Sequence, residues 1–146
     1  MTSRLALAPV VFTLVALTAC QDYNAGMQRS LARADETSAL ASLHSIIAAE
    51  RAYSLSNGGE YGTFQQLVDA GLLDSRFSSG KPAKDYVIVL NVTPKSESSP
   101  EGSYACNADP EQAGERAGRH FYIDSTSGLI HANDTQPATG ADKALQ

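Results

Sequence analysis

The side chains best suited to chemistry gather in the last third of the sequence. His120 and His131 flank Asp124 and the hydroxyl-rich run 125–127 (Ser-Thr-Ser). Two histidines that meet across a hairpin, with a carboxylate beside them, can bind a metal ion or transfer protons. No third ligand stands at a metal-site spacing, and no serine lies in a nucleophile-elbow motif. We therefore interpret them as exposed strand-end histidines around a turn that favours Ser and Thr.

The remaining polar candidates also lack a catalytic pattern. Glu50 and Glu60 could pair, but they stand on either side of a predicted turn, and Glu50 is placed on the wetter side of its helix. The glycines within 58–62 match neither a P-loop nor a dinucleotide fingerprint. His44 is a boundary residue of the same helix. The sequence thus predicts no catalytic residue, no metal site, no cofactor and no small-molecule substrate.

The charge balance argues against a nucleic-acid partner. The chain has 11 Lys and Arg against 16 Asp and Glu, and its formal net charge is −5. Proteins that bind phosphate backbones cluster basic side chains on one face. No such cluster occurs here, so we expect no nucleic-acid binding.

The N-terminus has the pattern of an export signal. Arg4 precedes an apolar run from Leu5 to Leu17, which Pro9 interrupts, and small residues follow up to Cys20. This run is shorter than the roughly 20 residues of a spanning helix. We expect residues 1–19 to be a cleaved signal peptide.

The end of this segment resembles the lipobox of bacterial lipoproteins. It reads Leu17, Thr18, Ala19, Cys20. The resemblance implies that signal peptidase recognises Leu17, Thr18 and Ala19, and that the thiol of Cys20 carries the lipid. Two or three acyl chains anchor a protein stably. The expected location is the cell envelope, facing the periplasm, and Gln21, in place of the Asp that retains lipoproteins in the inner membrane, favours the outer membrane.

A second interpretation uses the same region. Residues 12–15 (Phe-Thr-Leu-Val) resemble the residues after the cleavage point of type IV prepilins. Val11 stands where that family has Gly, and Ala16 stands where it has Glu. A cut before Phe12 would leave too few apolar residues for the membrane helix of the family. The lipoprotein interpretation is therefore preferred.

The periodicity of the mature chain predicts helices followed by strands. Residues 20–34 read as a polar tether. A helix over about 35–56 has apolar residues at spacings of three and four, namely Leu40, Leu43, Ile46, Ile47 and Tyr53. A second, short helix over about 64–70 follows a capping box of Thr63 and Gln66, and Gly71 stops it.

The second half alternates in the manner of strands. Residues 86–93 are rich in β-branched side chains, and shorter strands are predicted at 103–107, 120–124 and 129–132. Cys106, in the strand predicted at 103–107, is interpreted as a small buried apolar residue. Residues 133–146 have little to bury and are predicted to be a disordered tail.

Several segments resemble the type IV pilin and type II secretion pseudopilin group. They are AAERAYSLSNGGEYGTFQQL at 48–67, the strand at 84–93, Gly-Ser-Tyr at 102–104 and RHFYIDSTSGLIH at 119–131. The resemblance covers about 37–132. It implies an α+β head over 35–132, with one long N-terminal helix and a short helix packed on a three- to four-stranded antiparallel sheet. Some heads of this group hold Ca²⁺, but the acidic residues here match no ligand pattern: Asp109, Glu111, Glu115 and Asp124.

The sequence thus predicts a lipid-anchored, non-catalytic envelope protein with a structural or protein-interaction role. One alternative is a minor pseudopilin or pilin subunit, whose partners would be secretion or pilus proteins. Another is a small periplasmic ligand-binding lipoprotein, which requires a pocket.

Overall fold

The computed structural model describes residues 8–97, 100–112 and 118–145. Within them the chain forms two helices and then a sheet: α1 (Ala8–Ser56), α2 (Phe64–Asp69), β1 (Tyr86–Thr93), β2 (Ser103–Pro110), β3 (His120–Asp124), β4 (His131–Asn133) and β5 (Lys143–Ala144). Each strand pairs antiparallel with the next, in the order β1-β2-β3-β4-β5. The predicted α+β class, with a long helix, a short helix and an antiparallel sheet, is confirmed.

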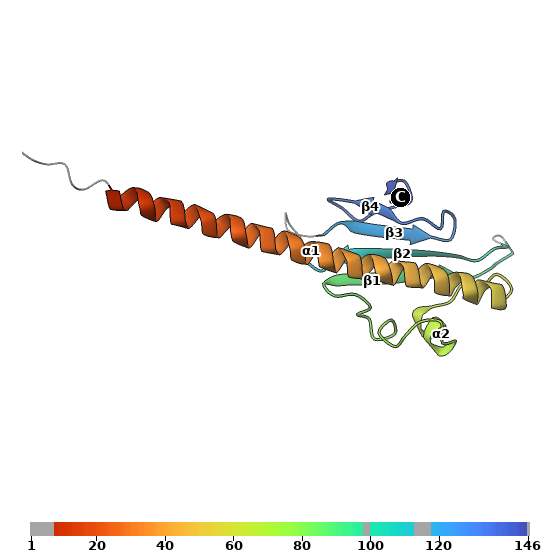
Figure 1. The fold of residues 1–146 in the computed structure, drawn as a ribbon. Helices are drawn as coiled ribbons and strands as arrows, with labels where there is room; N and C mark the ends of the chain where they lie inside the picture. Colours follow the sequence, from red (N-terminus) through yellow and green to blue (C-terminus); the bar gives the residue numbers. More distant parts are fainter. Residues whose placement is uncertain (1–7, 98–99, 113–117, 146) are drawn as a thin grey trace, which may run out of the picture.

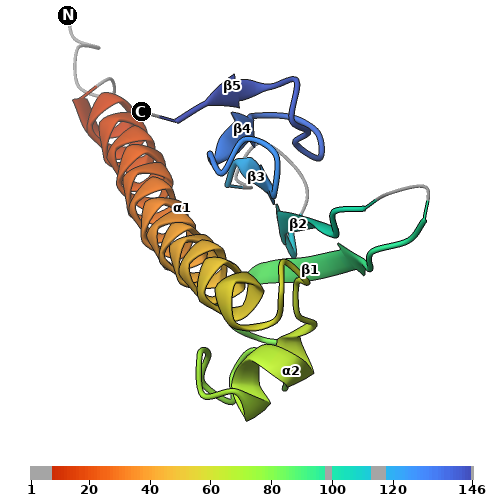
Figure 2. The same ribbon diagram turned by 90° about the vertical axis from the view of Figure 1, so that its right-hand side faces the viewer.

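The long helix has two parts with different surroundings. Its C-terminal part lies along one face of the sheet, and its N-terminal part extends well beyond the sheet (Figure 1). Helix α2 lies next to the C-terminal end of α1 (Figure 2). The polypeptide therefore forms a head with one protruding helix.

Helix α1 is longer than the sequence pattern predicted. The prediction began at residue 35 and made 20–34 a tether, but the helix is continuous from Ala8 to Ser56. The prediction assigned this segment to a loop because its residues are mostly polar. Residues 21–34 contain no proline, and most of them are compatible with a helix, so the single Gly26 weakens the helix without ending it.

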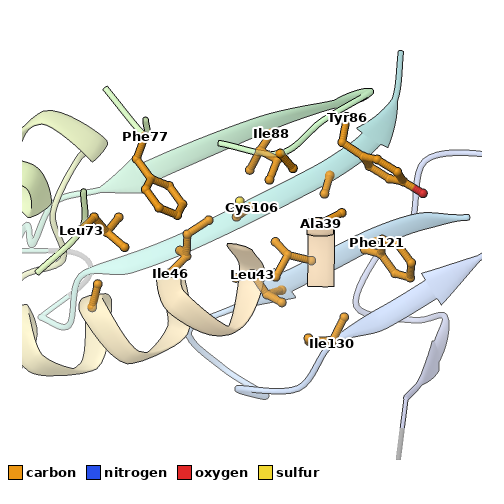
Figure 3. Close-up of a cluster of buried hydrophobic side chains, with 14 of the residues drawn as sticks. Ala39, Leu43, Ile46, Leu73, Phe77, Tyr86, Ile88, Cys106, Phe121 and Ile130 are labelled. Carbon is orange, nitrogen blue, oxygen red and sulfur yellow. The ribbon is translucent and has the colours of Figure 1, made fainter. Parts of the chain in front are cut away.

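The apolar stripe of α1 forms one side of the core. Ala39, Leu43 and Ile46 are fully buried against the sheet (Figure 3). The opposite side comes mainly from β1, β2 and β3, whose buried members include Tyr86, Ile88, Cys106, Phe121 and Ile123. The predicted burial of Cys106 is confirmed, and burial raises the pKa of its thiol far above the usual value. A neutral, inaccessible thiol is chemically inert.

A polar clamp fixes the angle at which α1 leaves the head. The Glu36 carboxylate accepts hydrogen bonds from the backbone N–H of Arg119 at 3.0 Å and from its guanidinium at 3.0 and 3.2 Å. The hydroxyl of Tyr86 donates to the Arg119 carbonyl at 2.8 Å. Because these bonds join α1 to β1 and to the residue before β3, the helix has little freedom to pivot on the sheet.

The connection from α1 to the sheet follows the predicted capping. The Thr63 side chain caps α2, and the Gln66 side chain bonds back to the N–H of Thr63 at 2.9 Å, which completes the capping box. The helix ends at Asp69, one residue before the predicted end. Gly71 then turns the chain with a φ of +71°.

Gly71→Val tests the turn after α2. A Cβ added at this position would have no other atom within 4 Å, so the substitution meets no steric obstacle. The left-handed backbone alone should destabilise the head by more than about 1 kcal/mol, because a β-branched side chain rarely adopts it. Urea unfolding measures the difference, and Gly71→Asn, which tolerates this conformation, is the control. Equal stabilities for the glycine and valine proteins would contradict the assigned backbone.

The sheet and the C-terminal segment depart from the prediction. Strand β1 matches its predicted range, whereas β2 continues to Pro110 and β4 lies at His131–Asn133 rather than 129–132. The predicted disordered tail is wrong, because β5 pairs with β4 and Ala138 is 1% exposed. The sheet accordingly has five strands instead of three or four.

Candidate functional site

A groove opens between the last turns of α1 and the turn that joins β3 to β4. Its volume is about 400 Å³, and we call it the α1 groove. Its lining includes Ile47, Arg51 and Leu55 of α1, Tyr61 of the α1–α2 loop, Tyr104 of β2, and Asp124 and Ser127 of the turn. Parts of the chain that are distant in sequence thus meet at one surface.

The α1 groove has an apolar rim and one unpaired cation. Leu55 is 82% exposed, and Leu129, which follows the lining residue Gly128, is 50% exposed. Among the residues that the structure describes, Arg51 has no hydrogen-bond or ion-pair partner. Arginine is enriched at protein-contact surfaces, and the exposed Leu55 lines the same groove. The groove therefore combines apolar area and an unpaired guanidinium at one opening.

The candidate Asp–Ser–His cluster proves to be a turn. One oxygen of Asp124 accepts from the backbone N–H groups of Thr126 and Ser127 at 3.0 and 2.7 Å, and from the Ser127 hydroxyl at 3.0 Å. Burial opposes ionisation of Asp124, but the hydrogen bonds from Ser127 and Thr126 outweigh it and hold the pKa of the carboxyl below its usual value. Ser127 Oγ also accepts from the Leu129 N–H at 3.2 Å.

The same contacts decide the role of His131. Its Nδ1–H donates a hydrogen bond to the Asp142 carbonyl at 2.7 Å, and its Nε2 lies 3.3 Å from Ser127 Oγ. The Ser127 hydroxyl lies closer to Asp124 Oδ1, at 3.0 Å, than to His131 Nε2, so it is engaged within the turn. His131 is 7% exposed and the His120 side chain is 17% exposed, so the prediction of exposed strand-end histidines is wrong for both residues.

His120 and the acidic residues considered as cation ligands make separate contacts and do not form one site. His120 Nδ1 lies 2.6 Å from Asp109 Oδ1, and Glu111 pairs with Lys81 at 3.2 Å. Glu115 lies outside the described residues. Within residues 8–97, 100–112 and 118–145, no three His, Cys, Asp or Glu side chains gather as a metal site would require.

Glu50 is the exceptional ionisable group of the head. Its side chain is fully buried, and Oε2 accepts a hydrogen bond from the Gly62 N–H at 2.9 Å. Oε1 has no partner among the described atoms. Burial raises the pKa of Glu50 to about 7, and the Gly62 bond offsets only part of that effect. Glu60 does not pair with Glu50, because its Oε2 instead accepts from the Lys95 N–H at 3.3 Å.

The spacing of apolar residues in α1 indicates that Glu50 is buried, although its charge suggests an exposed position. Leu43, Ile46, Glu50 and Tyr53 follow one another at spacings of three, four and three, so Glu50 lies on the apolar stripe of α1. Placing it on the wetter side was wrong. A carboxylate at such a position indicates either a buried partner or a raised pKa.

The four residues of the predicted lipobox lie in the N-terminal part of α1. The backbone of Leu17, Thr18, Ala19 and Cys20 is helical, and the side chains of these four residues are outside the described part of the structure. The leader residues 1–7 are also outside it. Over the described ranges, no helix combines the length and apolarity needed to cross a membrane.

Comparison with known proteins returns no relative. No protein-family model matches the chain, and neither a curated protein nor a solved structure matches it.

Proposed function

We propose that this chain is a lipid-anchored protein of the cell envelope, whose pilin-like head has a structural or protein-interaction role and no catalytic activity. Cys20 carries the lipid, and Leu17, Thr18 and Ala19 form the signal-peptidase recognition sequence. The head faces the periplasm, with the outer membrane as the favoured attachment. The single observation that carries this proposal is the lipobox sequence at the end of a charged and then apolar leader.

The architecture of the head supports an interaction role. The C-terminal part of α1 packs along an antiparallel sheet, as in a pilin-like head, and the candidate catalytic residues are engaged in turn and ion-pair contacts (Figure 1). A concave surface is available in the α1 groove, with its exposed leucine and the guanidinium of Arg51. Such a surface suits the side chains of a partner protein.

The alternative function is a minor subunit of a type II secretion or type IV pilus system. The observation that favours it is the continuity of α1, which runs without a break from Ala8 through Cys20 to Ser56. A long helix that extends beyond its head is suited to packing against equivalent helices of other subunits. The two functions require different N-terminal processing, so one experiment separates them.

Cys20→Ala should abolish lipid attachment. In a lipoprotein-processing host, radiolabelled palmitate should enter the wild type and not the variant, and the mature wild type should sediment with membranes. The variant should be released or remain as the precursor, and its head should melt at the same temperature, because Cys20 lies on the part of α1 that extends beyond the sheet. Cys106→Ala is the matched control and should label fully.

The mature N-terminus decides between the two functions. Cleavage before Cys20 and a blocked, acylated N-terminus support the lipoprotein. An unlabelled wild type whose mature chain begins at Phe12 would refute it and establish the pilus-type subunit instead.

A further inference from the structure

The buried carboxyl group of Glu50 is covered by the loop between α1 and α2. Residues 57–63 pass over the end of α1, and the Gly62 N–H within them donates to Glu50 at 2.9 Å, the only hydrogen bond that this carboxyl group receives from the described residues. Gly62 itself is buried, and a Cβ at this position would lie 3.0 Å from Leu67 and 3.3 Å from Tyr53. The loop therefore fits closely over the carboxyl group and leaves it no exposed surface.

The loop is held on its other side by contacts that do not involve Glu50. The backbone N–H of Gly59 donates to the Ser54 carbonyl at 2.8 Å, and Lys95 bonds both the Gly58 carbonyl and the Glu60 carboxylate. Tyr61 packs edge-on against Tyr104, with 5.0 Å between the ring centroids. The segment around Gly62 can thus separate from Glu50 while the loop remains attached elsewhere.

In the described part of the chain, no cation compensates an ionised Glu50. The ionisable groups that face it across the core are Tyr104 and Cys106 of β2, and burial raises the pKa of both well above neutrality, so both are uncharged. Arg51, the next residue on α1, is exposed, and on the covering loop the Glu60 carboxylate bonds Lys95 instead. Glu50 is accordingly part of no ion pair among these residues.

The two protonation states place different demands on the loop. In the neutral form, one oxygen accepts from Gly62 and the unpartnered atom carries the proton. In the ionised form, the same unpartnered oxygen bears negative charge in an apolar site, which is far more costly than burial of a neutral group. Water can relieve that cost only if the covering loop moves away.

We propose that the segment around Gly62, within residues 57–63, forms a proton-controlled cover over Glu50, closed while the carboxyl group is protonated and opened to water when it is ionised. The carboxyl group and the N–H of Gly62 are its two contact points. Tyr61, the residue before Gly62, lines the α1 groove, so the cover adjoins a wall of that groove. The device goes beyond the proposed envelope function and does not depend on lipid attachment.

Amide hydrogen exchange of the loop, together with a carboxyl ¹³C titration of Glu50, tests the cover. The variants are Glu50→Gln, which mimics the neutral carboxyl, and Glu97→Gln, which makes the same change at an exposed position. The Glu50 carboxyl should titrate with a midpoint near 7. After correction for intrinsic exchange, protection of Gly62 in the wild type and in Glu97→Gln should fall about tenfold or more between about pH 5.5 and pH 8.5. In Glu50→Gln it should stay constant.

Three results would overturn the cover. One is a Glu50 midpoint near that of a free glutamic acid, which would mean that the carboxyl group is hydrated in the closed head. Another is a midpoint near 7 with unchanged protection of Gly62, because the loop then stays closed over the charge. The third is an equal loss of protection in Glu50→Gln, which would assign the opening to some other ionisable group.

Discussion

Glu50→Gln is expected to be more stable than the wild type at about pH 8.5 and equally stable at about pH 4. The Glu50 side chain is 0% exposed. This burial raises the pKa of its carboxyl from 4.5 to about 7. Glutamine keeps the size of the group and the oxygen that accepts from Gly62. It removes the possibility of a buried negative charge and places an NH₂ group at the position of the unpartnered Oε1.

The pH range of the difference follows from the two pKa values. Below pH 4.5, Glu50 is protonated in both the folded and the unfolded chain, so the substitution changes little. Between pH 4.5 and about 7, the unfolded chain has released the proton and the folded chain retains it, so the stability of the wild type falls as the pH rises. Above about 7 both states are ionised, and the difference stays constant at no more than about 3.5 kcal/mol.

Urea unfolding of the two proteins from about pH 4 to pH 9 measures this difference directly. Other ionisable groups, including Asp74, Asp124 and Asp142, whose pKa values are lowered, titrate alike in both proteins and cancel. Glu97→Gln serves as the control for the loss of one negative charge at the surface. A stability difference that is flat across this range, or one that favours the wild type at high pH, would contradict a raised pKa for Glu50.

The main secondary structure of the head could be predicted because each element has its own periodic signal. The apolar spacing of α1 places Leu43 and Ile46 in the core, and the alternation of β1 buries Tyr86 and Ile88 while the valines between them, at 87 and 89, stay exposed. The Thr63–Gln66 capping box likewise fixed the start of α2. These signals are local, so one sequence is sufficient to detect them.

The α1 groove could not be predicted from any local signal. Its walls come from α1, the α1–α2 loop, β2 and the β3–β4 turn, and their proximity depends on the packing of the helix across the sheet. Arg51 and Asp124 are 73 residues apart in the sequence (124 − 51), and only the fold brings them to one opening. The sequence pattern indicated the polar residues of the turn but not the surface that they help to form.

The C-terminal segment was missed for a different physical reason. Residues 133–146 offer few apolar side chains, and the absence of apolar burial was taken as disorder. The segment is instead ordered by hydrogen bonds. Asp142 accepts from the Thr139 N–H at 2.7 Å and from the Asn133 side chain at 2.8 Å, and Asn133 in turn accepts from the Thr135 N–H at 3.0 Å. Loops that are ordered by their own hydrogen bonds have no characteristic hydropathy pattern.

Removal of residues 134–146 is therefore expected to destabilise the head substantially, where a disordered tail could be removed without effect. The truncation removes β5 and three groups that form hydrogen bonds with the rest of the sheet. Asn107 Nδ2 loses the Ala138 carbonyl, His131 Nδ1 loses the Asp142 carbonyl, and the Ile130 carbonyl loses the Leu145 N–H. Leaving partly buried groups unpaired costs about 1 kcal/mol or more each, so the expected loss is roughly 3–5 kcal/mol.

Thermal unfolding followed by circular dichroism compares the truncated chain with the full one. Because the stability of a small domain is itself only about 5–15 kcal/mol, the truncated head should melt well below the full chain. Gln136→Ala, at an exposed position within the same segment, should melt with the wild type and shows that the effect belongs to the lost contacts. An unchanged melting temperature after truncation would mean that β5 contributes nothing to the sheet. A large decrease would establish that the β4–β5 pairing and the loop between them are an integral part of the head.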